Sequence, residues 1–445
     1  MTLLDKKKKT KFLSNFTASE FINKFRKNEI TAEEYAMAIV KKINSCEKKI
    51  RSWVCYDLES FIKKAKKVDT EFTKNKKSQS LTGVPVGIKD IFNTCEFPTG
   101  FGTKVPFNPK PGNDARVVTS LLDNGAIILG KTTTAEFGIH HPPETINPID
   151  NKRIIGTSST GSAVAVRTGM VPIALGSQTA GSTSRPCSYL GIYGFKPSFG
   201  VLPRTAMLKT TDTLDTVTVI ARSIDDLLLT FDCIRVYGRN YPIVHSKLKK
   251  HVVKNKIKIG LLNGPKSHLI NPIIKNQIRL KLEKLDSKLF NIREYKLPNY
   301  FEKAHYYHEL IYSKCLSYYF KNEWKKFEGK FSETTRSMIE YGFKISNTEY
   351  LDALSWQNKA QKIFENSMND FDIVTCPSTA DESPYIGEKE IDDHNLIWSL
   401  CRLPSITIPG LKGCSGLPVG IEIIGKRFDD YKVLEVAKRL DENIN

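Results

Sequence analysis

Residues 171–200 read "VPIALGSQTAGSTSRPCSYLGIYGFKPSFG" and carry the most informative local pattern of the chain. The apolar runs "VPIALGS" and "IYGFKPS" predict two strands. Between them, residues 176–186 ("GSQTAGSTSRP") are mostly small or hydroxylated. Three interpretations compete for this turn: a flexible linker, an anion-binding loop, or the housing of a nucleophilic serine. A turn between a strand and a helix can present a serine hydroxyl while backbone N–H groups converge on one point.

Strands and helices alternate around this turn. Residues 115–125 ("ARVVTSLLDNG") predict a helix that ends at Gly125, and residues 126–130 ("AIILG") a buried strand. Residues 132–138 ("TTTAEFG") predict the start of another helix, and residues 161–169 ("GSAVAVRTG") a helix of small residues. Such alternation is typical of an α/β protein, and we expect a substantially parallel sheet.

The two outer regions differ from this pattern. Residues 18–65 have the apolar spacing of helices, and residues 237–370 are rich in lysine and aromatic side chains and read as mostly helical. Strand-like runs return from residue 371, in "FDIVTCPST", "LPSITIPG" and "LPVGIEIIG". We therefore expect one domain over residues 1–445, built on one continuous sheet with a helical elaboration at 237–370.

Composition narrows the class of protein. The chain has 445 residues, of which 40% are hydrophobic, and a net charge of +19. No run of 18 apolar residues exists, so we expect no membrane span, and the basic N-terminus lacks the apolar region of a signal peptide. The nine scattered cysteines form no CxxC pair, which favours a reducing cytoplasm. Basic clusters at residues 6–11 and 247–258 lack interleaved aromatics, so we interpret them as solvated surface.

Several familiar sites are excluded by their context. Residues 125–132 ("GAIILGKT") match the letters of a P-loop, but their variable positions are strand residues and a helix precedes them. The pairs His140-His141 and His305-x-x-His308 form no known metal-ligand set, and we expect them on the surface or in packing. No GxSxG elbow for a Ser-His-Asp hydrolase is present. We expect neither a metal nor a cofactor.

The remaining hypothesis is catalysis by a serine nucleophile whose base is not a histidine. Residues 156–162 ("GTSSTGS") and 176–182 ("GSQTAGS") both combine hydroxyls with small residues. A serine nucleophile needs a base, and a lysine serves when burial lowers its pKa toward neutrality. Lys89 lies within the apolar run "VPVGIKDIF" (84–92), which suits that role, although ordinary Gly/Ser loops remain the alternative.

Four segments together resemble the amidase signature family. They are "GVPVGIKD" (83–90), "NPIDNKRIIGTSSTGSAVAV" (147–166), residues 171–200 and "LDTVTVIARSIDDL" (214–227). The resemblance runs from about residue 18 to the C-terminus and is weakest over 237–370. It implies a large mixed, mostly parallel twisted sheet flanked by helices. It also implies cofactor-free cleavage of carboxamides through a Ser–Ser–Lys triad.

The resemblance assigns roles to individual residues. It implies that Ser182 is the nucleophile, that Ser158 is the middle serine of the triad, bound through a cis peptide, and that Lys89 is the base. Ser158 would then relay a proton between Ser182 and a neutral Lys89. The implied oxyanion hole consists of the backbone N–H groups of Thr179, Ala180, Gly181 and Ser182.

The chain departs from the family pattern around these residues. Thr157 and Thr160 replace glycines, Gln178 replaces an acid and Ala180 replaces a glycine, while Arg185 lies one place later than the usual arginine. The segment "NKAQKIF" (358–364) also lacks an arginine expected for binding a glutamine carboxylate. We interpret these departures as separating the chain from the branch that transamidates charged tRNA.

The resulting hypothesis is a cytoplasmic amidase that hydrolyses a small-molecule amide through an acyl-enzyme on Ser182. The alternative is the glutaminase component, called the A subunit, of a tRNA-dependent amidotransferase. A non-catalytic scaffold of the same fold is a third interpretation, which the presence of Lys89, Ser158 and Ser182 disfavours. If the chain is the small-molecule amidase, we expect no nucleic-acid partner, and the chain could form a homodimer.

Overall fold

The computed structural model describes residues 13–107, 110, 112–238, 241–250 and 256–444. Its centre is an eleven-stranded sheet in the order β1-β3-β2-β4-β6-β5-β10-β11-β9-β7-β8. The strands are β1 (Trp53–Tyr56), β2 (Pro85–Lys89), β3 (Ile127–Thr132), β4 (Ile173–Gln178), β5 (Tyr193–Lys196), β6 (Thr216–Ala221), β7 (Ile257–Asn263), β8 (Phe290–Lys296), β9 (Ile373–Pro377), β10 (Ser405–Lys412) and β11 (Pro418–Ile424).

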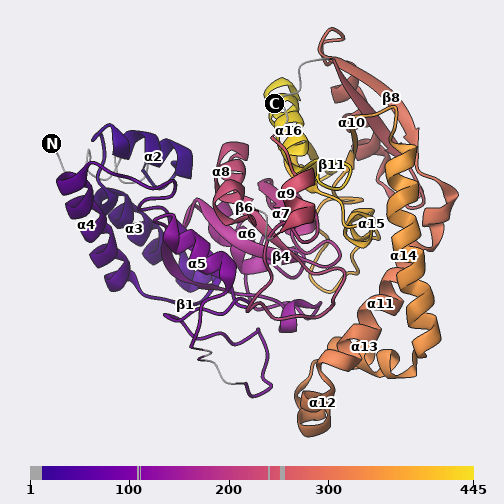
Figure 1. Cartoon of the computed structure of the whole chain (residues 1–445), viewed down its shortest axis with the longest axis horizontal. Coiled ribbons are helices and arrows are strands. Elements are labelled where there is room, and N and C mark those ends of the chain that lie inside the picture. The colour runs from indigo at the N-terminus through magenta and orange to yellow at the C-terminus, as the bar shows by residue number, and fades with distance from the viewer. Residues whose placement is uncertain (1–12, 108–109, 111, 239–240, 251–255, 445) are drawn as a thin grey trace.

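Helices flank the sheet and extend from both of its ends (Figure 1). The α-helices are α2 (Ala18–Arg26), α3 (Ala32–Ile50), α4 (Leu58–Asn75), α5 (Arg116–Asp123), α6 (Thr160–Arg167), α7 (Ser184–Leu190), α8 (Ile224–Ile234), α9 (Pro242–Lys247), α10 (Pro272–Glu283), α11 (Ala304–Tyr319), α12 (Lys321–Phe327), α13 (Glu333–Lys344), α14 (Asn347–Ser367), α15 (Asn395–Leu400) and α16 (Asp430–Ile444). Short 3-10 turns are η1 (Glu136–Gly138), η2 (Ser267–Leu269), η3 (Asn299–Lys303) and η4 (Glu328–Lys330). In Figure 1, α2 to α4 lie at the left and α11 to α14 at the right.

The N-terminal helices begin where the sequence supplies capping residues. Thr17 and Thr31 each accept a hydrogen bond from the backbone N–H three residues later, and the side chains of Glu20 and Glu34 accept one from the backbone N–H of the cap. The expected helical region at 18–65 is therefore present as α2, α3 and the first part of α4, although β1 interrupts it.

The sheet is mixed, as expected, but it is not mostly parallel. Six of its ten strand pairings are antiparallel and four are parallel. The strands β4 and β5, joined through α7, do run in the same direction, but β6 lies antiparallel between them. In the same way β11 lies antiparallel between β9 and β10. The local pattern correctly predicts that strands joined through a helix, such as β4 and β5, run in the same direction. It contains no signal that β6 and β11 lie between such strands.

One further expectation was wrong. Residues 132–138 do not begin an α-helix but end in the 3-10 turn η1, because Phe137 (φ +51°) and Gly138 (φ +68°) adopt left-handed conformations. The region 237–370 is mostly helical, and in addition it contains two strands, β7 and β8, which pair in parallel at one edge of the sheet. Charged residues interrupt the apolar ones in both strands, with Lys258 in β7 and Arg293, Glu294 and Lys296 in β8, so their composition resembles that of the surrounding lysine-rich helices.

The P-loop-like segment is strand, as its residue types indicate. All residues of β3 are buried. Lys131 Nζ forms an ion pair with Asp90 Oδ1 at 3.1 Å and donates to the Thr99 hydroxyl at 2.6 Å. The lysine of this motif therefore has a structural partner inside the protein.

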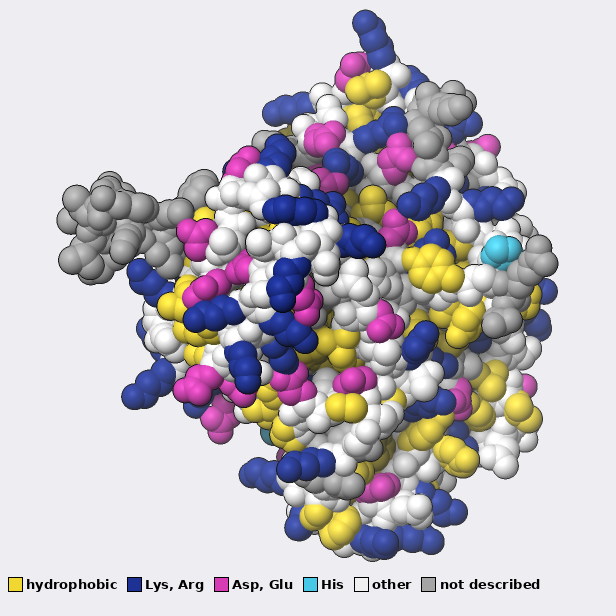
Figure 2. Space-filling view, turned by 60° about the vertical axis from the view of Figure 1, so that its left-hand side comes forward, with side chains coloured by type: hydrophobic (Ala, Val, Ile, Leu, Met, Phe, Trp, Pro, Cys, Tyr) yellow, Lys and Arg dark blue, Asp and Glu magenta, His cyan; other side chains and the backbone are white. Residues whose placement is uncertain are grey.

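Basic side chains are spread over the surface. Figure 2 shows lysine and arginine interspersed with aspartate and glutamate on the face that includes the N-terminal helices. The basic cluster at 6–11 lies outside the described residues, as do residues 251–255 of the second cluster. Among the helices that are described, none is long and apolar enough to cross a membrane.

Candidate active site

Two parallel strands place the predicted residues at one edge of the sheet. The strands β2 and β4 are neighbours, with Val86 opposite Ile173 and Ile88 opposite Leu175. Lys89 is the last residue of β2, and the turn at 179–182 follows directly after β4. Because parallel strands end at the same edge, the lysine and the turn come together there, where α/β proteins usually bind ligands.

Lys89 is fully buried among hydroxyl groups. Its Nζ atom lies 2.7 Å from the Ser158 Oγ, 3.1 Å from the Ser159 Oγ and 2.8 Å from the Ser177 Oγ. Burial lowers the pKa of Lys89 to about 7, and the Asp215 carboxylate opposes this shift in part. A lysine in these surroundings is substantially uncharged near neutral pH and carries a lone pair that can accept a proton.

The hydrogen-bond donors around Lys89 can be counted. The Ser159 hydroxyl donates its single proton to the Ser177 carbonyl at 3.1 Å, so it can only accept from Lys89. An uncharged amine has two N–H donors and one lone pair, so one of the three hydroxyls must donate to it. Ser158 or Ser177 is therefore that donor, and a proton can pass between a serine and the amine.

The two serine loops meet through their backbones. The Thr157–Ser158 peptide is cis and non-proline, as the resemblance implied. The next residue, Ser159, donates its N–H to the Ser182 carbonyl at 3.1 Å. Lys89 and Ser158 are completely buried, whereas Ser182 is 8% exposed and so lies nearer to solvent. Within the described residues, no direct hydrogen bond joins the Ser182 and Ser158 hydroxyls.

The carbonyl groups of residues 179–182, here called the nucleophile turn, are all occupied. They accept, in order, from His308 Nε2 at 3.0 Å, the Ser399 hydroxyl at 2.8 Å, the Arg185 N–H at 3.0 Å and the Ser159 N–H at 3.1 Å. In the part of the chain that is described, the four N–H groups of the turn donate no hydrogen bond. The turn therefore offers a group of unused backbone donors, which is the requirement for binding an oxyanion.

The departures from the family pattern have structural roles. The Gln178 Oε1 atom accepts from the N–H groups of Thr183 and Ser184, both at 3.0 Å, at the start of α7. A carboxylate oxygen could accept the same two bonds, so glutamine replaces the usual acid without loss of this contact. The side chain of Gln178 is completely buried, which keeps it away from a substrate.

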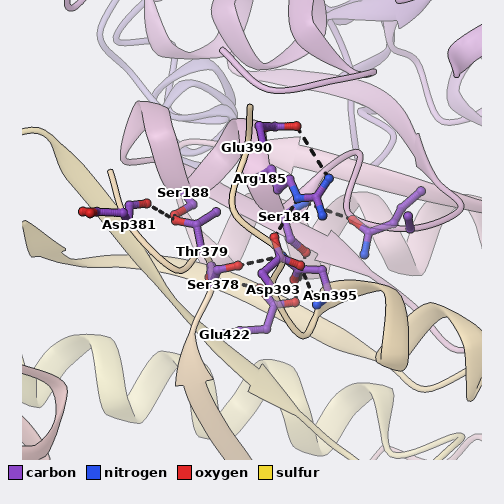
Figure 3. A network of polar contacts seen from close by, with 12 residues as sticks. Ser184, Arg185, Ser188, Ser378, Thr379, Asp381, Glu390, Asp393, Asn395 and Glu422 are labelled. Atoms are coloured by element: carbon purple, nitrogen blue, oxygen red, sulfur yellow. Dashed lines mark hydrogen bonds and ion pairs between the residues drawn. The ribbon is translucent and has the colours of Figure 1, made fainter. Parts of the chain in front are cut away.

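Arg185 binds acidic side chains of the protein. Its Nε lies 2.6 Å from the Asp393 Oδ2 and its Nη1 lies 3.7 Å from the Glu390 Oε2. Figure 3 shows the Arg185 side chain between these two acidic side chains. In the same network the Ser184 hydroxyl donates to the buried Glu422 carboxyl at 3.0 Å. Burial raises the pKa of Glu422. These contacts attach α7 to the C-terminal part of the sheet.

Sequence reasoning missed four residues of this site: Ser159, Ser177, His308 and Ser399. The two serines lie inside the motifs that were singled out, and the continuous run of apolar and small residues in β4 could have marked Ser177 as buried. His308 was expected on the surface or in packing; it is buried and contacts the nucleophile turn. No local signal identifies His308 or Ser399, because their partners lie 129 and 219 positions away. Among the described residues, no group of three or more His, Cys, Asp or Glu side chains is arranged to hold a metal ion.

Comparisons with known proteins identify the family of the chain. The profile of the Amidase family matches residues 34–434. The A subunit of glutamyl-tRNA(Gln) amidotransferase from Sulfurihydrogenibium sp. (strain YO3AOP1) is 30% identical over 97% of this chain and 96% of its own length. The protein of the same name from Natranaerobius thermophilus is 26% identical, with the same coverage of both chains.

Solved structures share the fold at lower identity. A protein described as an amidase superposes with a TM-score of 0.86 at 22% identity, covering 97% of this chain and all of its own. The peptide amidase of Stenotrophomonas maltophilia gives a TM-score of 0.82 at 20% identity, covering 97% of each chain. The profile match and the relatives decide the classification: the chain belongs to the amidase family, whose enzymes act on amide C–N bonds.

Proposed function

We propose that the chain cleaves amides through an acyl-enzyme on Ser182, with Ser158 as proton relay and Lys89 as base. The observation that carries the proposal is the contact of 2.7 Å between Lys89 Nζ and Ser158 Oγ, made by a lysine whose pKa is lowered to about 7. This pair lies beside a turn that contains Ser182 and has unused N–H donors. The N–H groups of residues 179–182 form the oxyanion hole.

The reaction proceeds in two stages. Ser182 Oγ attacks the amide carbon while its proton passes to Ser158 and the Ser158 proton passes to the uncharged Lys89. The oxygen of the tetrahedral intermediate takes the negative charge and is bound by the N–H groups of the turn. The relay then returns a proton to the leaving nitrogen as the C–N bond breaks. Water, deprotonated by the same relay, attacks the ester on Ser182 and releases the acid.

A second candidate is the A subunit of a tRNA-dependent amidotransferase, which would act as a glutaminase. Two relatives with that name align with the chain over almost their whole length, at 30% and 26% identity. They favour this candidate over a free-standing hydrolase. The substitutions at Gln178 and Arg185 do not oppose it, because both side chains bind the protein itself. Both candidates use the same chemistry on Ser182. A cytoplasmic location and a homodimer remain predictions from the sequence.

One experiment separates the two candidates. The purified chain is assayed alone on aliphatic, aryl and urea-like amides and on glutamine, and again with the other components of an amidotransferase and Glu-tRNA(Gln). Turnover of simple amides by the chain alone supports the hydrolase. Glutamine hydrolysis that depends on the other components and on charged tRNA supports the amidotransferase. Ser182→Ala abolishes either activity if the proposal is correct, and an unchanged rate in that variant would refute it.

A further inference from the structure

The carbonyl contacts of the nucleophile turn determine where its N–H groups point. In a trans peptide the C=O and the following N–H lie in one plane and point in opposite directions. Among the described residues the Thr157–Ser158 bond alone is cis, so every peptide of the turn is trans. A contact that holds the Thr179 carbonyl therefore fixes the direction of the Ala180 N–H. A contact on the Ala180 carbonyl fixes the Gly181 N–H in the same way.

We propose that His308 and Ser399 are positioning residues for the oxyanion hole, each aiming one N–H donor at the reacting carbonyl. His308 fixes the Ala180 N–H and Ser399 fixes the Gly181 N–H. This proposal rests on the proposed function, because it assigns a role within the same reaction. It adds two residues from segments remote from the triad, the helices α11 and α15.

His308 can act only as a hydrogen-bond donor at this contact. A carbonyl oxygen accepts and cannot donate, so the Nε2 atom 3.0 Å from the Thr179 oxygen must carry the proton. Burial lowers the pKa of His308 to about 4, so the ring is uncharged near neutral pH. The nearby charged and titratable groups that oppose its protonation are His305, His140 and Arg185. The imidazole therefore holds the carbonyl without placing a positive charge beside the hole.

A second contact restrains the same residue. The Thr179 hydroxyl donates to the Asp215 Oδ1 at 2.8 Å, and the Asp215 Oδ2 accepts from the N–H groups of Thr210 and Thr211 at 2.7 and 2.9 Å. Thr179 is thus held through its side chain by one segment and through its carbonyl by α11. Together these two contacts restrict rotation of the peptide plane between Thr179 and Ala180.

Ser399 has its single proton committed to the turn. It donates to the Ala180 carbonyl at 2.8 Å and accepts from Gln178 Nε2 at 3.3 Å. It is 1% exposed, so water cannot replace it without rearrangement of α15. Gln178 in turn accepts from the first N–H groups of α7, so one buried chain of hydrogen bonds links α15, the nucleophile turn and α7.

The test compares variants that remove or keep each donor. His308→Leu removes the donor, whereas His308→Gln keeps an N–H in a similar place. We expect kcat of His308→Leu to fall about 10- to 100-fold, because misplacing a catalytic group by about 1 Å costs roughly that much. KM changes little, since the contact does not touch the substrate. His308→Gln should recover most of the loss, and Ser399→Ala should lower kcat as His308→Leu does.

The matched control is Ser313→Ala. Ser313 is also a buried polar residue of α11, but its hydroxyl has no partner among the described residues. This variant should keep a normal kcat and melting temperature. The rate at which a fluorophosphonate labels Ser182 is also measured on every variant, because the phosphoryl oxygen of the probe binds in the oxyanion hole. We expect this labelling rate to change in the same proportion as kcat.

Three results would overturn the inference: a normal kcat in His308→Leu, a His308→Gln variant as slow as His308→Leu, or a loss confined to KM. Each of these would leave the proposed function intact if the wild-type chain is active and labelled on Ser182. A wild-type chain that neither cleaves amides with its partners present nor labels on Ser182 would overturn both proposals. If His308→Leu does not fold, the other two variants decide the test. Ser399→Ala must then show the lowered kcat, and His308→Gln must keep most of the wild-type kcat.

Discussion

Arg185 and Asp393 form a close ion pair, with 2.6 Å between Nε and Oδ2, although 208 positions separate them in the sequence. Asp393 also accepts from the N–H of Asn395 at 2.9 Å, at the first residue of α15. Glu390 lies on the other side of the guanidinium (Figure 3). The pair therefore ties α7, which follows the nucleophile turn, to the start of α15.

Replacing Arg185 should lower both the stability of the folded protein and the rate of amide turnover. Arg185→Ala leaves Asp393 buried without its partner, which costs on the order of 3–5 kcal/mol. We expect a lower folded yield and melting temperature together with lower activity, measured by thermal unfolding and amide turnover. Arg279→Ala is the control, because it breaks the exposed pair with Glu283 and should cost under about 1 kcal/mol. An Arg185→Ala enzyme of normal stability with only KM raised would instead indicate contact with substrate.

Ser182 should be the residue that is acylated. A fluorophosphonate probe is expected to add its mass to the peptide that contains Ser182, because this serine is partly exposed beside unused N–H donors. Mass spectrometry after digestion reads the site. The control is Ser162→Ala, since the Ser162 hydroxyl is committed to the Leu175 carbonyl at 2.8 Å and should not react. Labelling confined to Ser158 or Ser162 would contradict the assignment.

The pH dependence of the rate should report Lys89. Its pKa is about 7, and only the uncharged amine can accept a proton, so kcat/KM should rise with pH through about 7 and then level off. Lys89→Ala should lose about 10⁴-fold or more in kcat. Lys89→Arg should be as inactive, because a guanidinium stays protonated.

The control for Lys89 is another buried lysine. Lys131 is paired with Asp90, so Lys131→Met should lower the melting temperature and leave the midpoint of the pH profile unchanged. A Lys89→Arg enzyme with near-normal kcat would show that Lys89 only holds the loop, and the mechanism would then be wrong.

Acid should destabilise the folded chain through buried histidines. Burial lowers the pKa of both His308 and His394 from about 6.5 to about 4. Between these values the unfolded chain binds more protons than the folded chain, so the free energy of unfolding falls as the pH falls from about 6.5 to 4. Each histidine contributes on the order of 3 kcal/mol to this loss.

Denaturant unfolding at pH 7.5 and 4.5 measures the acid effect. His394→Phe keeps an aromatic ring against Trp398 and removes the titrating group, so it should reduce the difference between the two pH values. His245→Gln, at an exposed position, should leave that difference unchanged. A His394→Phe variant with the full acid loss would show that other groups cause it.

Local sequence predicted the parts of the fold that local interactions decide. The bounds of the helices α5 and α6 and of the strands β3 and β4 lie within two residues of the expected ones, because apolar spacing and glycine positions act over a few residues. Which strands pair depends on contacts between distant parts of the sequence. The antiparallel positions of β6 and β11 in the sheet were therefore not predicted. The candidate site shows the same division. Lys89 and the serine turns are predictions from local sequence that the fold brings close together, whereas His308 and Ser399 depend on contacts across the fold.

The strand order of the sheet bears on synthesis of the protein. The six strands from β1 to β5 in the sheet order all come from residues 53–221, and the other five come from residues 257–424. The two groups meet where β5 pairs with β10. A ribosome releases the first group long before residue 405 emerges, so the edge of β5 stays unpaired until β10 has been synthesised. An unpaired strand edge is a template for pairing with other chains, so the incomplete polypeptide is open to aggregation at β5 until β10 covers it.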